Sequence, residues 1–188
     1  EGKTVNVTLD NVNIDTSETG EAAVSVTGSG NTNIELNGNN TLTSGSGHAG
    51  LEHNKETNSE GKETSGTLTI TDNNNDGKLT ANGGIDGAGI GGSDEHDGQV
   101  TITGGEITAT GGNGAAGIGG GAGDKYAAVD GDGDVTISGG TITATGGSGA
   151  AGIGGGLDGN GTVIITGGDI TAKARGYYGA GIGGGCGK

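Results

Sequence analysis

Apolar and polar residues alternate in short stretches along most of this chain, and glycines separate the stretches. In residues 100–103, Val-Thr-Ile-Thr, every second side chain is aliphatic, and residues 107–110, Ile-Thr-Ala-Thr, repeat the alternation. A period of two is typical of a strand with one buried face. Gly104-Gly105 and Gly111-Gly112 end these stretches, and a third segment of mostly small residues follows at 115–119. The pattern therefore predicts three short strands joined by glycine corners.

The same unit recurs along the chain. The sequence GGEITATGGNGAAGIGGG at 104–121 returns as GGTITATGGSGAAGIGGG at 139–156, and more loosely as GGDITAKARGYYGAGIGGG at 167–185. Repeated units of this size stack, because one unit alone cannot bury its apolar face. We therefore predict an all-β fold, a right-handed parallel β-helix of about six coils with three short strands per coil. Residues 1–188 form one domain in this interpretation, excised from a larger secreted protein.

Alignment of the aliphatic residues predicts four ladders of inward side chains, one residue per coil. The first ladder, centred on the Gly-Ile-Gly segments, is Val26, Leu51, Ile90, Ile118, Ile153, Ile182. The second is Leu9, Leu36, Ile70, Ile102, Ile137, Ile165, and the third is Val7, Ile34, Leu68, Val100, Val135, Val163. The fourth is Ile14, Leu42, Leu79, Ile107, Ile142, Ile170.

Composition supports a thin, regular core rather than a globule. The chain has 50 glycines, three tyrosines as its aromatic residues, and no Pro, Met, Trp or Phe. Val, Ile and Thr favour strands, and the lack of proline and of a Gly-X-Y period excludes collagen. The single Cys186 cannot form an intrachain disulfide.

The formal net charge of −15 disfavours nucleic acids and anionic membranes as partners. No apolar run approaches the ~20 residues that span a bilayer, so we expect no membrane insertion. Together with the Asn-, Thr- and Gly-rich composition, this indicates an extracellular or cell-surface protein.

Two aspartate-rich segments are candidate calcium sites, because carboxylate and amide oxygens at alternate positions suit this ion. Asp72, Asn74 and Asp76 resemble the first half of an EF-hand loop, although the twelfth position is Gly83, which cannot ligate. Asp130, Asp132 and Asp134 form the second candidate. A solvated Asx-rich turn is the favoured explanation of either segment. Calcium is nevertheless the one cofactor that the sequence suggests.

Exposed aromatic rings are candidates for stacking on sugars, since a core this thin needs no rings. Tyr177 and Tyr178 lie near the cations Lys173 and Arg175, and Tyr126 lies beside Lys125 in a long insertion. The same tyrosines could instead fill a gap near the end of the helix. The three histidines show no metal-ligand spacing and are interpreted as surface residues.

Outward threonines also form ladders, among them Thr108, Thr143 and Thr171. Cross-strand threonine pairing explains such a ladder. A flat Thr-x-Thr array is also typical of ice-binding proteins, but Lys173 and Asn82 interrupt the array here.

The repeated GIGGG segments resemble the glycine-rich repeats of secreted and surface proteins from gut and soil bacteria. They are similar in particular to β-helical carbohydrate-binding modules attached to plant-polysaccharide-degrading enzymes, including xylan binders. The likeness covers residues 68–188 well and 1–67 weakly. It implies a right-handed parallel β-helix, an extracellular location and non-catalytic binding of a polysaccharide.

We therefore expect a carbohydrate-binding module for a neutral, xylan-like plant cell-wall polysaccharide. The alternatives are a structural stalk or adhesin repeat, a polysaccharide lyase or hydrolase on the same fold, and an ice-binding protein. An enzyme is disfavoured, because Arg175 is the single arginine and no paired carboxylates are evident on a strand face.

Overall fold

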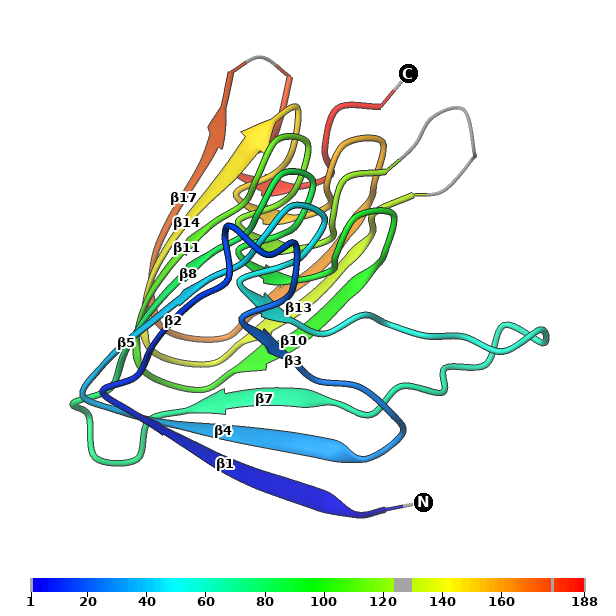
Figure 1. Ribbon diagram of the computed structural model, residues 1–188. Helices are drawn as coiled ribbons and strands as arrows, with labels where there is room; N and C mark the ends of the chain where they lie inside the picture. The colour runs from blue at the N-terminus through cyan, green and yellow to red at the C-terminus, as the bar shows by residue number, and fades with distance from the viewer. Residues whose placement is uncertain (1, 124–129, 177, 188) are drawn as a thin grey trace.

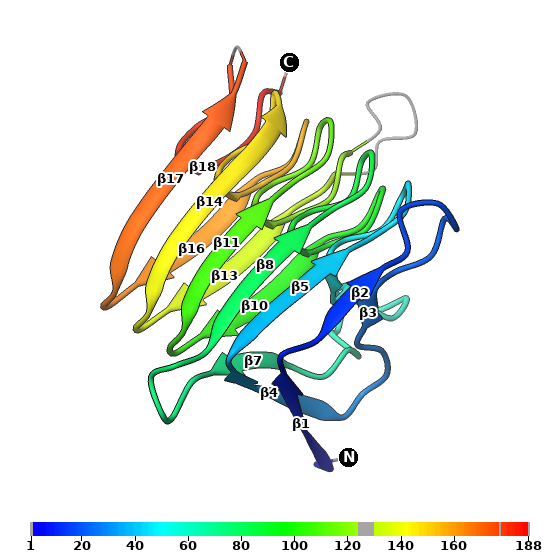
Figure 2. The ribbon, with the colours of Figure 1, turned by 60° about the vertical axis from the view of Figure 1, so that its left-hand side comes forward.

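The chain forms a parallel β-helix of six coils, each with three strands (Figure 1). The computed structural model describes residues 2–123, 130–176 and 178–187. The three six-stranded sheets are parallel throughout, and consecutive coils lie side by side (Figure 2). The predicted fold class is therefore confirmed.

We name the sheets by the position of their strands in each coil. Sheet A contains β1 (Thr4–Asp10), β4 (Asn31–Asn37), β7 (Leu68–Thr71), β10 (Gly98–Ile102), β13 (Gly133–Ile137) and β16 (Gly161–Ile165). Sheet B contains β2 (Asn13–Asp15), β5 (Asn39–Thr43), β8 (Lys78–Asn82), β11 (Glu106–Thr110), β14 (Thr141–Ser148) and β17 (Asp169–Arg175). Sheet C contains β3 (Val24–Ser25), β6 (Leu51–Glu52), β9 (Ile90–Gly91), β12 (Ile118–Gly119), β15 (Ile153–Gly154) and β18 (Ile182–Gly183).

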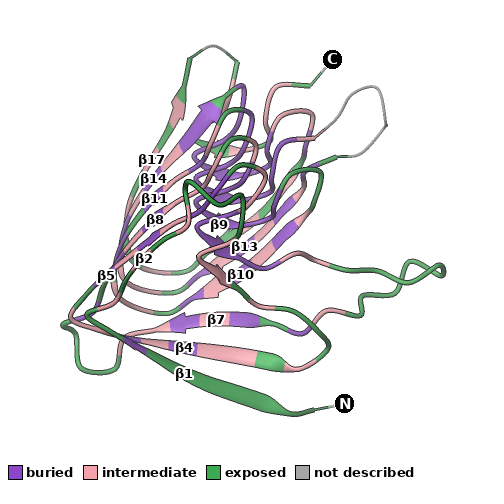
Figure 3. Cartoon of the chain, viewed as in Figure 1, coloured by how far each residue is buried: buried purple, intermediate pink, exposed green. Residues whose placement is uncertain are grey.

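Aliphatic side chains stack along the axis and form the core, which is most deeply buried in the middle coils (Figure 3). In sheet C, Ile118 pairs with Ile90 on one side and Ile153 on the other, as predicted. All three side chains are fully buried. Stacking of identical side chains explains how so few large residues close the interior.

The first ladder is wrong at its first residue. Val24, not Val26, pairs with Leu51. The sequence alignment pairs the segments around Val26 and Leu51 through their small and aliphatic residues. The strand β3 is too short for its pattern of apolar residues to fix the register.

The register between the second and third coils also differs from the prediction, by two residues. Ile70 pairs with Ile34 rather than Leu36, and Ala81 pairs with Leu42. Asn40 takes the inward position opposite Leu79, where an aliphatic residue was expected. An alignment based on apolar residues alone misses a buried asparagine.

Asn40 is accommodated because every polar group of its side chain finds a backbone partner. Its Oδ1 accepts a hydrogen bond from the Val12 amide at 3.1 Å, and its Nδ2 donates to the carbonyls of Asn37 at 3.0 Å and Lys78 at 3.1 Å. Buried polar groups are tolerated when their hydrogen bonds are satisfied. The side chain thus links the sheet A–sheet B corners of the first three coils.

Glycine is required where neighbouring coils approach most closely, in sheet C. Gly119 has a φ of +134°, and a Cβ added there would lie 2.0 Å from the carbonyl oxygen of Gly154. Any side chain would therefore push these coils apart. This explains why the Gly-Ile-Gly segment is the most regular part of the repeat.

Candidate functional site

The outer face of sheet A carries a row of side chains that is polar on the first five strands and aliphatic on the last. One row across the six strands reads Asn6, Asn33, Thr69, Thr101, Thr136, Ile164. Because successive residues of a strand point to opposite faces, this row projects away from the core while its neighbours at Val7, Ile34 and Ile70 point inward. Two hollows along this face are lined by described residues.

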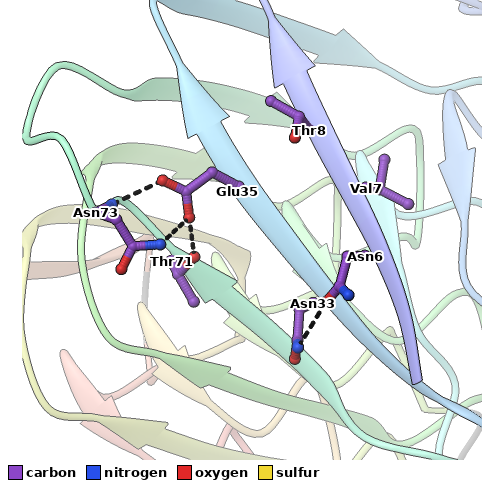
Figure 4. A pocket seen from close by; sticks show the side chains of 7 residues that line it. All are labelled: Asn6, Val7, Thr8, Asn33, Glu35, Thr71 and Asn73. Atoms are coloured by element: carbon purple, nitrogen blue, oxygen red, sulfur yellow. Dashed lines mark hydrogen bonds between the residues drawn. The ribbon is translucent and has the colours of Figure 1, made fainter. Parts of the chain in front are cut away.

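The larger hollow lies over the first three coils and has a volume of about 550 Å³ (Figure 4). Its walls are amides, hydroxyls and one carboxylate, with a single aliphatic side chain: Asn6, Val7, Thr8, Asn33, Glu35, Thr71, Asn73. We call it the N-terminal hollow. Such a lining offers hydrogen bonds and little apolar surface, so it suits a hydroxyl-rich ligand better than a hydrophobic one.

Glu35 holds one wall of this hollow in place. Its Oε1 accepts a hydrogen bond from the Asn73 amide at 2.8 Å, and its Oε2 accepts from the Thr71 hydroxyl and from Asn73 Nδ2 at 2.6 Å. The bond from Thr71, followed by the bonds from Asn73, keeps the pKa of Glu35 below its ordinary value. The carboxylate is thus ionised at neutral pH, and it fixes the corner that follows β7.

On the opposite wall, Asn33 Nδ2 donates to Asn6 Oδ1 at 3.0 Å. Within the described part of the chain, the Asn6 Nδ2 and Asn33 Oδ1 atoms have no further hydrogen-bond partner. One donor and one acceptor therefore stand on neighbouring strands, which lie about 4.8 Å apart in a sheet.

The second, shallower hollow lies over the later coils and has a volume of about 140 Å³. Its polar lining comes from β10, β13 and β16 and from the residue before β7: Thr67, Gln99, Thr101, Asp134, Thr136, Thr162. Four aliphatic residues complete the lining: Leu68, Val100, Val135, Ile164. We call it the C-terminal hollow. It continues the outer face of sheet A beyond the N-terminal hollow, since both are lined by the same sheet.

The insertion between β6 and β7, residues 53–67, borders this second hollow. It extends away from the coils (Figure 1) and contains an antiparallel bridge between Thr57 and Glu63. Lys55 forms an ion pair with Asp134, and Gln99 Nε2 donates to Glu63 Oε1 at 3.0 Å. The hydrogen bond to Asp134 raises the pKa of Lys55, so the ammonium group of Lys55 is charged at neutral pH.

A row of side chains just before the sheet A strands ties successive coils together. Asp97 accepts a hydrogen bond from the Asp132 amide at 2.9 Å, and Asp132 accepts from the Asn160 amide at 2.6 Å. Burial raises the pKa of Asp97, against the lowering effect of its hydrogen bond from Asp132. These aspartates act as structural links between coils.

The structure places the first predicted calcium segment in the corner between β7 and β8. Asp72 Oδ2 accepts from the Gly77 amide at 3.2 Å, and Asn74 Nδ2 donates to Asn37 Oδ1 at 2.7 Å. Asp72 and Asp76 line a corner hollow of about 250 Å³, which Asn74 does not line.

In the second segment, Asp130 is exposed, Asp132 bonds the next coil and Asp134 pairs with Lys55. Asp134 also lies within β13, not in a loop as the sequence indicated. Among residues that the structure describes, no three His, Cys, Asp or Glu side chains are grouped so as to hold a metal ion.

The predicted sugar-stacking residues are on the last coil or outside the described residues. Lys125, Tyr126 and Tyr177 belong to the latter group. Lys173 and Arg175 are on β17, and Tyr178 follows β17 with 84% of its surface exposed. These three line neither hollow of sheet A.

His53 corrects the expectation that the histidines are surface residues. It is 1% exposed, and its ring nitrogens lie 3.1 Å from the Val26 carbonyl oxygen and 2.8 Å from that of Gly66. It therefore closes the base of the insertion. The sequence analysis missed Asn6, Asn33 and Glu35, whose one signal was the polar half of the alternation in residues 4–10 and 31–37. It also missed Asn73, which lies in the corner after β7 and has no such signal.

Comparison with known proteins supports the architecture. The family model described as "Beta helix repeat" matches four segments, residues 74–94, 100–122, 135–157 and 163–186. These segments are similar to that family of repeats. The four matches fall on the third to sixth coils, where the glycine-rich repeat is most regular.

No curated protein and no solved structure matches the chain. A search of the described residues for a helix capable of crossing a bilayer finds none.

Proposed function

We propose that this parallel β-helix is a non-catalytic, extracellular module that binds a neutral polysaccharide along the outer face of sheet A. The observation that carries the proposal is the pair of polar hollows on one continuous sheet. An extended sugar chain presents hydroxyls at regular intervals, and this face presents amide and hydroxyl groups at regular strand spacing.

The charge of the chain selects among glycans. A formal net charge of −15, with the Glu35 carboxylate on the lining of the N-terminal hollow, opposes a polyuronate. A neutral chain of the xylan type meets no such repulsion. The choice of xylan among neutral glycans rests on the likeness of the GIGGG repeats to xylan-binding modules.

The carboxylate chemistry supports binding without catalysis. The N-terminal hollow is lined by one carboxylate, Glu35, whereas glycoside hydrolysis uses a pair. The pKa of Glu35 is lowered, which is the opposite of what a general acid needs at neutral pH. Asp134 in the C-terminal hollow is neutralised by Lys55.

Affinity electrophoresis through gels containing xylan, mixed-linkage β-glucan or polygalacturonate tests this function. We expect retardation by xylan and none by polygalacturonate. Retardation by none of the polymers would contradict polysaccharide binding, and release of reducing ends from xylan would contradict the non-catalytic assignment.

A matched pair of double variants tests the location. Thr101→Ala with Thr136→Ala removes two hydroxyls from the C-terminal hollow, and Thr108→Ala with Thr143→Ala removes two from the outer face of sheet B in the same coils. We expect at least about fivefold weaker binding for the first pair, the value of one or two lost hydrogen bonds. The second pair should bind as the wild type does.

Asn33→Ala tests the N-terminal hollow in the same assay, with the same expected loss. The triple variant Tyr126→Ala, Tyr177→Ala, Tyr178→Ala tests the alternative location that the sequence suggested. If the triple variant loses binding while the sheet A variants keep it, the assignment to sheet A is wrong.

A further inference from the structure

The two hollows on the outer face of sheet A meet at the third coil. Thr71 lines the N-terminal hollow, and Thr67 lines the C-terminal hollow. Thr69 stands between them on β7, in the outward row that pairs with Asn33 on one side and Thr101 on the other. Because these three outward side chains of the third coil are all threonines, none of them is bulky enough to separate the hollows. The two hollows therefore form one polar path, which we call the axial path.

The axial path crosses the strands and so runs parallel to the axis of the β-helix. Its centre is the outward row of sheet A, whose polar members are Asn6, Asn33, Thr69, Thr101, Thr136. The N-terminal hollow widens this row on one flank, where Glu35 stands two residues after Asn33 on β4. The C-terminal hollow widens it on the other flank, where Gln99 stands two residues before Thr101 on β10. Each of these coils thus presents one polar residue to the row.

Two walls restrict the direction in which a ligand can lie on this face. The corner that follows β7 reaches over β4 through the hydrogen bonds from Asn73 to Glu35. The insertion that precedes β7 reaches β10 through Glu63 and β13 through Lys55. These two segments lie at opposite ends of β7 (Figure 1). A ligand laid along the strands meets a wall at each end, whereas a ligand laid across the strands passes between the walls.

The spacing of the coils matches a straight pyranose chain. When every ring is linked equatorially through opposite corners, as in xylan, the chain is extended, and each sugar advances it by close to one strand spacing, about 4.8 Å. One sugar then lies over each coil. A chain with axial linkages, of the amylose type, curves into a helix and leaves a straight row after a few coils.

The side-chain chemistry of the row suits hydroxyl groups at this interval. Asn6 Nδ2 and Asn33 Oδ1, on neighbouring coils, have no further hydrogen-bond partner among the described residues. A sugar hydroxyl can both donate and accept a hydrogen bond, as can the hydroxyls of the threonines along the row. Consecutive sugars of one chain can therefore bond consecutive coils.

We propose that the axial path holds a straight, equatorially linked pyranose chain parallel to the β-helix axis, with one sugar over each coil. This inference rests on the proposed polysaccharide binding and specifies the class of chain that is bound. Asn33 and Thr136 lie three strands apart in sheet A, which corresponds to about 14 Å. A chain of four sugars is therefore the shortest ligand that contacts both residues.

Nuclear magnetic resonance titration of the whole chain with xylotriose and with xylohexaose tests this arrangement. The hexaose should shift the amide signals of β4 and β13 with one common affinity, about tenfold or more tighter than that of the triose, because it bonds both hollows at once. The triose is too short to contact both strands and should titrate them independently. Equal affinities for the two ligands would overturn the arrangement of one sugar per coil.

Asn33→Ala tests whether one ligand spans both hollows. With the hexaose, this variant should weaken the binding observed at β13 by about threefold or more, although β13 lies three strands away. With the triose, binding at β13 should be unchanged, which also shows that the variant is folded. Thr143→Ala, on the outer face of sheet B in the coil of β13, is the matched control and should bind both ligands as the wild type does. An unchanged hexaose affinity at β13 in Asn33→Ala would refute the inference.

Maltohexaose tests the class of chain, because its axial linkages curve it. It should bind no more tightly than maltotriose, and a gain equal to that of xylohexaose would refute the restriction to straight chains. The xylan gel distinguishes the two proposals from each other. Retardation by xylan with equal affinities for triose and hexaose would overturn the axial arrangement alone, whereas no binding of xylan or of any oligosaccharide would overturn both.

Discussion

At the scale of single residues, the closest approach between coils is set by glycines that admit no substitution. Gly119→Ala places a Cβ 2.0 Å from the Gly154 carbonyl oxygen at a φ of +134°. We expect the free energy of unfolding to fall by about 3 kcal/mol or more, since the clash and the backbone strain add. Gly61→Ala is the matched control, because its φ is +74° and its Cβ meets nothing within 4 Å. It should cost about 1 kcal/mol in urea unfolding. Equal losses in the two variants would contradict the steric explanation.

The hydrogen bonds of Glu35 predict that the stability of the fold depends on pH through this carboxyl group. Its pKa is lowered in the folded chain, so its ionised form stabilises the fold above the ordinary value of 4.5. This stabilisation is lost as the pH falls through the lower folded pKa. We expect the stability difference between wild type and Glu35→Gln to shrink from about pH 7 to about pH 3, as urea unfolding measures. Glu60→Gln, at an exposed position of the insertion, is the charge control and should show no such trend. A difference for Glu35→Gln that is constant with pH would contradict this role.

At the scale of elements, each strand contributes to the stability of the fold in proportion to how completely its two neighbouring strands cover it. Ile118 in β12 is fully buried between β9 and β15, whereas the equivalent Ile182 in β18 is 46% exposed. Ile118→Ala should cost about 3 to 4 kcal/mol, within the range for a buried aliphatic truncation, and Ile182→Ala about 1 kcal/mol. Chemical denaturation of the two variants measures the difference. Similar costs would show that the last coil is as well covered as the fourth.

Element boundaries also show which parts of the fold the sequence could predict. The alternation in residues 100–110 located β10 and β11, because there the polar and apolar halves are unbroken. The register of β4 and β5 was missed because Asn40 is buried with its hydrogen bonds satisfied, which no pattern of apolar residues can reveal. The polar hollows were missed for a related reason, since alternation identifies an outward side chain but not which outward face is hollowed.

At the scale of the whole molecule, stability comes from the stacking of neighbouring coils, as in other solenoids. The protection of backbone amides against hydrogen exchange should therefore decrease toward both ends. Amide hydrogen exchange should be slowest in β11 and β14 and faster in β2 and β17, whose outer edges have no strand beside them within the chain. Measured by mass spectrometry at low concentration, uniform protection across all coils would contradict this gradient.

The sequence by itself determined the parallel β-helix and most of its inward rows, because the repeat makes every coil a copy of the one before it. Local alternation and glycine corners are enough to predict which strands pair when neighbouring strands come from neighbouring repeats. Only the tertiary structure decided the register of the first three coils and the hollows on sheet A. Each of these features depends on contacts between residues of different types, such as Asn40 with Lys78 or Glu35 with Asn73. Such contacts do not recur at a fixed interval along the sequence.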